Sequence, residues 1–206
     1  MAYLVGIAGG SGSGKGTLAD LIQKHLNLWD LKSFILSTDD CYKDLSYYSK
    51  EERDNFCFNR KFNFDHPNAI DFDRLICYAQ KMKEGISFDY PKYDFKIHTY
   101  GAEKVNVPEK IDVAIIEGIY ALYSGSKMGT DTSKLINIYD HRLFVVTDPK
   151  IAQNRRILRD VEERGRDIKQ VIKQLNLTVF PMYEKYIGPT HINADDIVDW
   201  RTDETK

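Results

Sequence analysis

The chain has 206 residues, of which 42% are hydrophobic and 29% are charged, as in one soluble globular domain with a single large core. Its 31 acidic and 29 basic residues leave a formal net charge of −2, which excludes the broad basic field of a nucleic-acid or membrane-surface binder. The longest apolar stretch, 113–123, is too short to span a bilayer, and no signal peptide is predicted. Three cysteines without CxxC spacing favour neither disulfides nor zinc. We therefore expect one cytoplasmic domain over residues 1–206, without nucleic-acid or membrane partners.

Short apolar runs alternate with segments of helical period along most of the chain. Strands without polar alternation, typical of strands covered on both faces, are predicted at 3–8, 33–37, 113–116 and 143–146. Helices are predicted around 18–26, from Phe72 to near Gly85, from Asp148-Pro149 to Gly165, and from Ile168 until Pro181 ends or kinks the last one. This alternation predicts an α/β fold with a parallel sheet flanked by helices.

An insert separates the second and third predicted strands. Residues 38–69 are polar and aromatic with no sustained period, and residues 86–107 are typical of a β-hairpin with Gly101 near its turn. We expect this β-hairpin and helix insert, about 40–108, to form a second-substrate site beside a nucleotide-binding sheet.

The strongest local signal is the sequence Gly9-Gly-Ser-Gly-Ser-Gly-Lys-Gly-Thr17, which contains the G-x4-G-K core of a P-loop. It lies between a predicted strand and an amphipathic helix, the context in which glycine N–H groups and the helix N-terminus hold phosphates. The predicted nucleotide site comprises Gly9, Gly10, Ser11, Gly12, Ser13, Gly14, Lys15, Gly16 and Thr17, with Lys15 reaching the β- and γ-phosphates. Gly16 stands where a Ser or Thr usually binds Mg²⁺, and Thr17 follows it.

Two acidic positions follow predicted strands. Asp39 and Asp40 come after the second strand, where either carboxylate could accept a proton from an attacking hydroxyl, and their position alone does not separate them. Glu117 ends the third strand and is a candidate Mg²⁺ or water ligand, the alternative being a solvated strand-end acid.

A basic cluster spans Arg155 to Arg166. Arg156, Arg159 and Glu163 share one helical face, and Arg164 and Arg166 flank Gly165 at a turn. The pattern predicts a mobile lid over phosphates, about 155–170, and the alternative is a solvated charged helix.

These motifs together resemble those of the uridine kinase (uridine–cytidine kinase) family of P-loop kinases. The resemblance runs from about residue 3 to 198. Its motifs are 6–15, 36–39 with 42–43, 62–67, 91–95 with 98–99, 115–118, 143–148, 155–167 and 181–190, and Asn63-Phe-Asp-His-Pro67 is the most specific of them.

The resemblance implies transfer of the ATP γ-phosphate to the 5′-hydroxyl of uridine or cytidine, with Mg²⁺. It matches Asp39 to the family's catalytic base, and it implies that Asp39 and Glu117 are the metal ligands. It also implies that Lys15, Arg159 and Arg164 contact the phosphates. The expected pyrimidine-nucleoside site consists of Asp65 at the ribose hydroxyls together with Tyr93, Phe95, His98, Arg156, Arg166 and Gln174. Family members are often oligomeric, so the resemblance also allows a homo-oligomer.

Three departures accompany the resemblance. Gly16 lacks the usual hydroxyl, and Tyr100 stands where an Arg commonly follows His-Thr. The segment 195–201 resembles the start of the family's final strand, and the terminal helix that usually follows it is not expected here. Three hypotheses remain open: a pyrimidine-nucleoside kinase, a related kinase acting on another small hydroxyl acceptor, such as a phosphoribulokinase-like or nicotinamide-riboside-kinase-like enzyme, or a non-catalytic nucleotide-binding protein.

Overall fold

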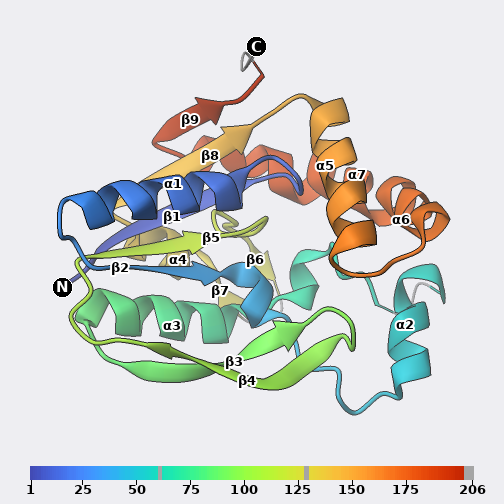
Figure 1. The fold of residues 1–206 in the computed structure, drawn as a ribbon, viewed down its shortest axis with the longest axis horizontal. Coiled ribbons are helices and arrows are strands. Elements are labelled where there is room, and N and C mark those ends of the chain that lie inside the picture. Colours follow the sequence, from blue (N-terminus) through green and yellow to red (C-terminus); the bar gives the residue numbers. More distant parts are fainter. Residues whose placement is uncertain (60–61, 128–129, 202–206) are drawn as a thin grey trace.

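The computed structural model describes residues 1–59, 62–127 and 130–201, and its centre is a parallel sheet (Figure 1). The strands are β1 (Tyr3–Gly9), β2 (Ser33–Ser37), β5 (Val113–Glu117), β8 (His141–Val146) and β9 (Asp196–Asp199), in the order β2-β5-β1-β8-β9. Every neighbouring pair is parallel, so the carboxyl ends of the strands share one edge. The predicted fold class and the four predicted strands are confirmed.

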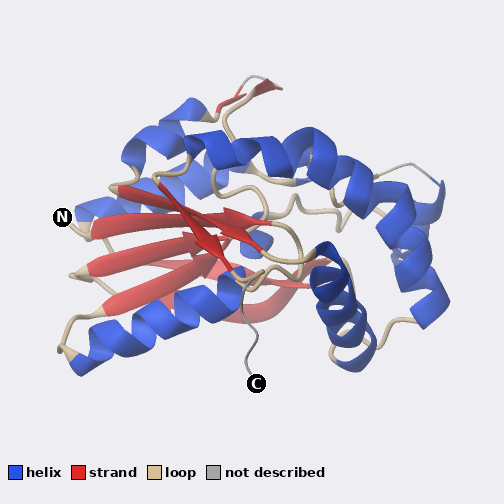
Figure 2. Cartoon of the chain, turned by 90° about the horizontal axis from the view of Figure 1, so that it is seen from above, coloured by secondary structure: helices blue, strands red, loops and turns tan. Residues whose placement is uncertain are grey.

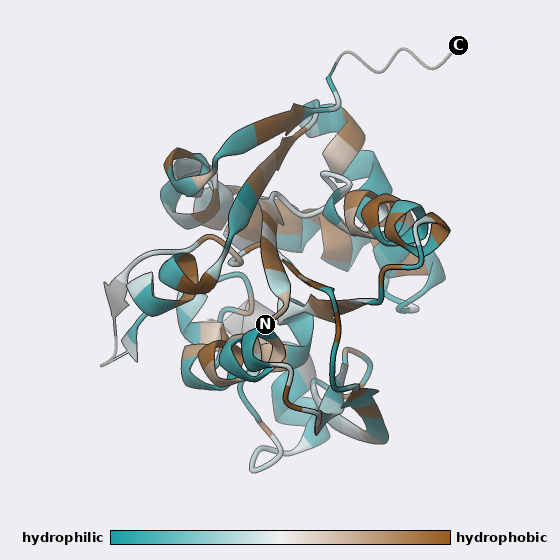
Figure 3. Ribbon diagram, turned by 90° about the vertical axis from the view of Figure 1, so that its left-hand side faces the viewer, coloured by the Kyte–Doolittle hydropathy of each residue, from teal (hydrophilic) through white to brown (hydrophobic). Residues whose placement is uncertain are grey.

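Helices cover both faces of this sheet (Figure 2). Alternate residues of β1 face opposite sides: Val5 and Ile7 pack with Ala19 of α1 (Lys15–Leu28), whereas Leu4 and Ala8 belong to the larger core. That larger core also contains the buried side chains of α3 (Phe72–Glu84) and α4 (Ser133–Ile138). The hydropathy colouring follows this arrangement, with apolar strands inside and polar helix faces outside (Figure 3).

The insert contains the expected hairpin and an unexpected helix. β3 (Phe88–Asp94) and β4 (Thr99–Val107) pair antiparallel; the turn lies at 95–98, and Gly101 is the third residue of β4, near that turn. The helix α2 (Lys50–Asn59) begins with a capping box, in which the Ser49 N–H donates to Glu52 (2.9 Å) and the Glu52 N–H donates to Ser49 Oγ (3.2 Å).

The C-terminal half is largely helical. α5 (Pro149–Glu162) begins at the expected Asp148 cap and ends three residues before Gly165. After α6 (Ile168–Gln174), π-helical turns at 175–179 and 183–187 flank α7 (Phe180–Met182), so the helical run passes Pro181 and does not end there. The wider π turns change the hydrogen-bond pattern around a residue that has no N–H to donate.

Short segments complete the described fold. They are the 3₁₀ helices Thr38–Cys41, Pro67–Ala69 and Gly188–Asn193 and the two-residue strands β6 (Ser126–Lys127) and β7 (Thr130–Asp131). No helix in the described ranges is long and apolar enough to cross a membrane.

Candidate active site

The P-loop joins β1 to α1 and forms one wall of a cavity of about 580 Å³. Gly12 and Gly14 have φ values of 79° and 94°, and a Cβ on Gly12 would lie 2.2 Å from the Ala152 carbonyl oxygen, so this loop path requires glycine. Lys15 Nζ donates to the Gly10 carbonyl at 2.9 Å, and burial lowers the pKa of this amine. The loop therefore presents a buried cation among backbone N–H groups.

The predicted P-loop residues divide between two cavities. Those that line the main cavity are Ser11, Gly12, Gly14, Lys15, Gly16 and Thr17. Gly10 and Ser13 line a second cavity of about 250 Å³ behind the loop, shared with Ser11, and Gly9 ends β1 outside both walls. No atom of the described residues lies within 4 Å of a Cβ built on Gly16, so the packing around this position leaves room for the side chain of a Ser or Thr.

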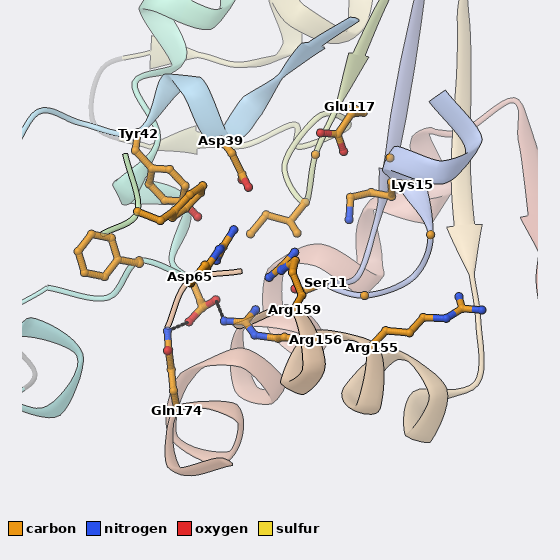
Figure 4. Close-up of a pocket in the computed structure, with 18 of the residues that line it drawn as sticks. Ser11, Lys15, Asp39, Tyr42, Asp65, Glu117, Arg155, Arg156, Arg159 and Gln174 are labelled. Atoms are coloured by element: carbon orange, nitrogen blue, oxygen red, sulfur yellow. Dashed lines mark hydrogen bonds and ion pairs between the residues drawn. The ribbon is translucent and has the colours of Figure 1, made fainter. Parts of the chain in front are cut away.

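Two carboxylates reach the cavity from neighbouring strands (Figure 4). Asp39 follows β2, and Glu117 ends β5, where its Oε1 accepts from Ser37 Oγ at 2.6 Å. Burial raises the pKa of Glu117, although the neighbouring Lys15 opposes the shift. Asp40 points elsewhere: it accepts from the Tyr93 N–H at 3.1 Å and does not line the cavity. Geometry thus separates two aspartates that sequence position left equivalent.

Asp65 is a buried carboxylate at the other side of the same cavity, with 5% of its surface exposed. Its Oδ2 accepts from Thr178 Oγ1 at 2.7 Å and from Gln174 Nε2 at 3.2 Å, and its Oδ1 lies 3.5 Å from Arg156 Nη2. The Tyr120 hydroxyl donates to the Asp65 backbone carbonyl. Side chains from α5 and from the helical run after it therefore fix this carboxylate, and Thr178 is a contact that the sequence did not indicate.

Aromatic rings surround Asp65 and form what we call the aromatic end of the cavity, made of Tyr42, Phe64, Asp65, Phe95 and His98. The Phe64 and His98 rings stack with centroids 4.8 Å apart, and the Arg164 guanidinium lies 3.7 Å over the Phe95 ring. Tyr93 does not line the cavity but packs behind Tyr42, with ring centroids 5.1 Å apart. This end can enclose a flat ring beside a hydrogen-bonding carboxylate.

Four of the predicted arginines converge on one residue that the sequence did not single out. Asp160 is fully buried and pairs with Arg159 (2.9 Å), Arg166 (3.3 Å), Arg164 (3.4 Å) and Arg156 (3.7 Å). Burial alone would raise the pKa of Asp160, but these four cations hold it below its usual value. Because all four arginines also line the main cavity, Asp160 gathers positive charge beside the P-loop.

At the opposite side, the cavity is lined by Gly14, Gly16, Thr17, Arg155 and Trp200, which we call the P-loop end. In Figure 4, Arg155 and Asp65 lie on opposite sides of Ser11 of the P-loop. One cavity is thus lined by the P-loop, by the carboxylates of Asp39 and Glu117 and by the aromatic end.

Comparison with known proteins identifies the family. A sequence model described as the phosphoribulokinase / uridine kinase family matches residues 4–205. The chain belongs to this family. It is 38% identical over 195 residues to the uridine kinase of Geobacillus kaustophilus, covering 95% of this chain and 84% of that one. It is 40% identical over 206 residues to uridine-cytidine kinase-like 1 of Mus musculus, covering 96% of this chain but 33% of that longer protein.

The fold is also that of solved members of this family. The phosphoribulokinase of Rhodobacter spheroides superposes with a TM-score of 0.68 at 14% identity, covering 96% of this chain and 70% of that one. At this identity the likeness concerns the fold alone.

Kinases transfer a charged phosphoryl group, and a metal ion commonly neutralises part of that charge. We therefore asked whether the residues of this cavity could hold Mg²⁺. The described residues contain no group of three or more His, Cys, Asp or Glu that could hold a metal by itself. Asp39 and Glu117 are nonetheless hard oxygen donors in one cavity, and Mg²⁺ is commonly held by one or two carboxylates together with substrate phosphates. The residues present therefore fit a Mg²⁺ ion that arrives with a nucleotide.

Proposed function

We propose that this chain transfers the γ-phosphate of ATP to the 5′-hydroxyl of uridine or cytidine and gives the nucleoside 5′-monophosphate. The observation that carries the proposal is the buried Asp65 carboxylate inside the aromatic end. Such a carboxylate accepts hydrogen bonds from both hydroxyls of a ribose, and the rings of Phe95 and His98 suit a flat pyrimidine. The 38% identity to a uridine kinase over 95% of the chain supports the same acceptor class.

The positions of the charged groups support a direct transfer. With the ribose diol at Asp65, the 5′-hydroxyl points toward the middle of the cavity, where Asp39 can accept its proton as the oxygen attacks the γ-phosphorus. Lys15, Arg159 and Arg164 line the cavity and neutralise charge on the transferring phosphoryl oxygens. Asp39 and Glu117 would hold Mg²⁺, which supplies further charge neutralisation when it is bound.

An acceptor panel tests this proposal. ADP release from ATP with Mg²⁺ is measured with uridine, cytidine, their 2′-deoxy forms, thymidine, ribulose 5-phosphate and nicotinamide riboside. We expect uridine and cytidine to stimulate ADP release strongly and the deoxynucleosides to stimulate it weakly. A 2′-deoxyribose lacks one of the two hydroxyls that can donate a hydrogen bond to Asp65.

The other outcomes assign the two alternative functions. Preference for ribulose 5-phosphate or nicotinamide riboside would move the acceptor away from pyrimidine nucleosides. Tight ATP binding without transfer to any acceptor at saturating Mg²⁺ would make the protein a nucleotide-binding protein.

A further inference from the structure

Asp160 is a buried carboxylate to which the transfer chemistry described above gives no part. It lies in the last turn of α5, it is fully buried, and it does not line the main cavity. Burying a charged group costs free energy unless the fold surrounds it with partners. Because Asp160 lies outside the cavity in which we place the substrates, any contribution to the reaction must pass through the residues around it.

One oxygen of Asp160 faces two arginines that we expect at the phosphates. Its Oδ1 lies 2.9 Å from Arg159 Nη2 and 3.4 Å from Arg164 Nη1, and both arginines line the main cavity. Arg159 interacts electrostatically with Lys15, and Arg164 interacts with Asp39. This side of Asp160 is therefore one contact away from the groups proposed to act on the phosphoryl group.

The other oxygen of Asp160 leads to the acceptor carboxylate by two routes. Its Oδ2 lies 3.3 Å from Arg166 Nη1 and 3.7 Å from Arg156 Nε. Arg156 Nη2 lies 3.5 Å from Asp65 Oδ1. Arg166 donates to Gln174 Oε1 at 3.3 Å, and Gln174 Nε2 donates to Asp65 Oδ2 at 3.2 Å (Figure 4). The two oxygens of Asp160 thus face different halves of the proposed reaction.

The charges in this group are unequal. Four guanidinium cations surround two carboxylates, those of Asp160 and Asp65, so positive charge is left in excess beside the P-loop. Cations at this spacing repel one another, and without an anion between them their side chains would move apart. A phosphoryl group supplies negative charge, and it is stabilised most by donors that are already aligned when it arrives.

We propose that Asp160 is a positioning residue that aligns Arg159 and Arg164 for the transferring phosphoryl group and ties them to Asp65 at the acceptor. The inference rests on the proposed function, since it takes the cavity to hold a phosphate donor and a ribose. Removal of the Asp160 charge should therefore cost alignment of the arginines while their attraction for an anion remains.

Asp160→Asn separates alignment from attraction, because it keeps the shape of the side chain and removes its negative charge. We expect kcat with uridine to fall by about 10²-fold, since misplaced arginines stabilise the transferring group poorly. Inorganic tripolyphosphate with Mg²⁺ should bind about threefold to tenfold more tightly in calorimetry, because a negative charge near the cavity is gone. A merely structural defect would weaken binding and turnover together. An unchanged kcat, or tripolyphosphate that binds no more tightly than to the wild type, would overturn the inference.

Glu163→Gln is the matched control for the loss of one negative charge. Glu163 is exposed at the end of α5, three residues after Asp160. A solvated charge has little influence on buried groups, so kcat and the affinity for tripolyphosphate should both stay within about twofold of the wild type.

Two further variants test whether Asp160 acts through the arginines. Asp160→Glu keeps the charge and decides the question even if Asp160→Asn fails to fold. Its displaced carboxylate should lower kcat by about tenfold and leave the affinity for tripolyphosphate unchanged. In an Arg159→Gln background, Asp160→Asn should reduce kcat by a smaller factor than in the wild type, because part of the same network is already lost. A wild-type kcat in Asp160→Glu, or equal factors in the two backgrounds, would overturn the inference.

The readouts separate this inference from the proposed function. Transfer to uridine that survives in Asp160→Asn overturns the inference alone. If the wild type phosphorylates no acceptor of the panel, the proposed function is overturned. Tripolyphosphate binding that tightens in Asp160→Asn and not in Glu163→Gln would then still support Asp160 as the residue that sets the arginines for a phosphoryl group.

Discussion

The two ends of the cavity are built in different ways. At the aromatic end, polar side chains hold one another: Asp65 has partners in Arg156, Gln174 and Thr178, and all are buried. At the P-loop end, the groups that can contact a ligand are backbone N–H groups and the exposed side chain of Arg155, and the space beside Gly16 is open. If the acceptor binds at the aromatic end, as proposed, it meets a site whose geometry is already set by contacts within the chain.

The largest effect is expected where the two ends meet. Asp39→Asn removes the proton acceptor, so kcat should fall by about 10²–10⁴-fold while the Kd for ATP changes little. Steady-state kinetics and calorimetry measure the two quantities. The matched control is Asp40→Asn, whose side chain lies outside the cavity and should leave turnover unchanged. Loss of turnover in Asp40→Asn, with normal turnover in Asp39→Asn, would show that Asp40 and not Asp39 is the proton acceptor.

At the aromatic end, Asp65→Asn should raise KM for uridine by on the order of 10²-fold, because a charge-assisted hydrogen bond to the ribose is lost. The preference for uridine over 2′-deoxyuridine should shrink in the same variant, and KM for ATP should stay unchanged. Thr178→Val removes one donor to Asp65 and is the milder control, expected to raise KM for uridine about fivefold. An unchanged preference for the ribonucleoside in Asp65→Asn would show that Asp65 does not bind the ribose hydroxyls.

Asp40 is a partly buried carboxylate that accepts a hydrogen bond from the Tyr93 N–H, and its burial should make the free energy of unfolding depend on pH. Burial raises its pKa from 3.8 to about 6, so between these values the folded chain keeps a proton that the unfolded chain releases. The free energy of unfolding therefore falls as pH rises through this window, and Asp40→Asn removes that loss. The variant should gain on the order of 2 kcal/mol over the wild type between about pH 4.5 and pH 7, as measured by urea unfolding. A difference independent of pH would contradict the assignment.

The smallest effect is expected at the P-loop end. Gly16→Ser should fold normally, since nothing lies within 4 Å of the added Cβ. Its hydroxyl supplies the oxygen that P-loops usually place near Mg²⁺, so the Mg²⁺ concentration for half-maximal activity should fall by about twofold to fivefold. Gly16→Ala is the control for the added carbon. An equal response in both variants would show that the hydroxyl plays no part.

The sequence predicted the parts of the site that depend on strand ends. Buried parallel strands are continuous apolar runs, and the P-loop, Asp39 and Glu117 follow such runs directly, so their meeting at one sheet edge could be anticipated. The resemblance to uridine kinases added Asp65, which no local pattern marks.

Other features depend on how distant segments fold back. Asp160 becomes a centre of charge partly because the turn at Gly165 returns Arg166 to it; an i,i+4 spacing reveals only its pairs with Arg156 and Arg164. Which hairpin ring faces the cavity depends on the register shift between Pro91 and Tyr93, which simple alternation along β3 does not contain. The capping box at Ser49 was a readable signal for α2 that the missing hydrophobic period obscured.

In the proposed orientation, Asp65 holds the ribose diol while Asp39 faces the 5′-hydroxyl. The position of the new phosphate distinguishes this orientation from its reverse, and ³¹P NMR of the product from uridine and ATP determines it. We expect uridine 5′-monophosphate as the product. Phosphate on the 2′- or 3′-oxygen would show that the ribose lies the other way round in the cavity, with its diol away from Asp65.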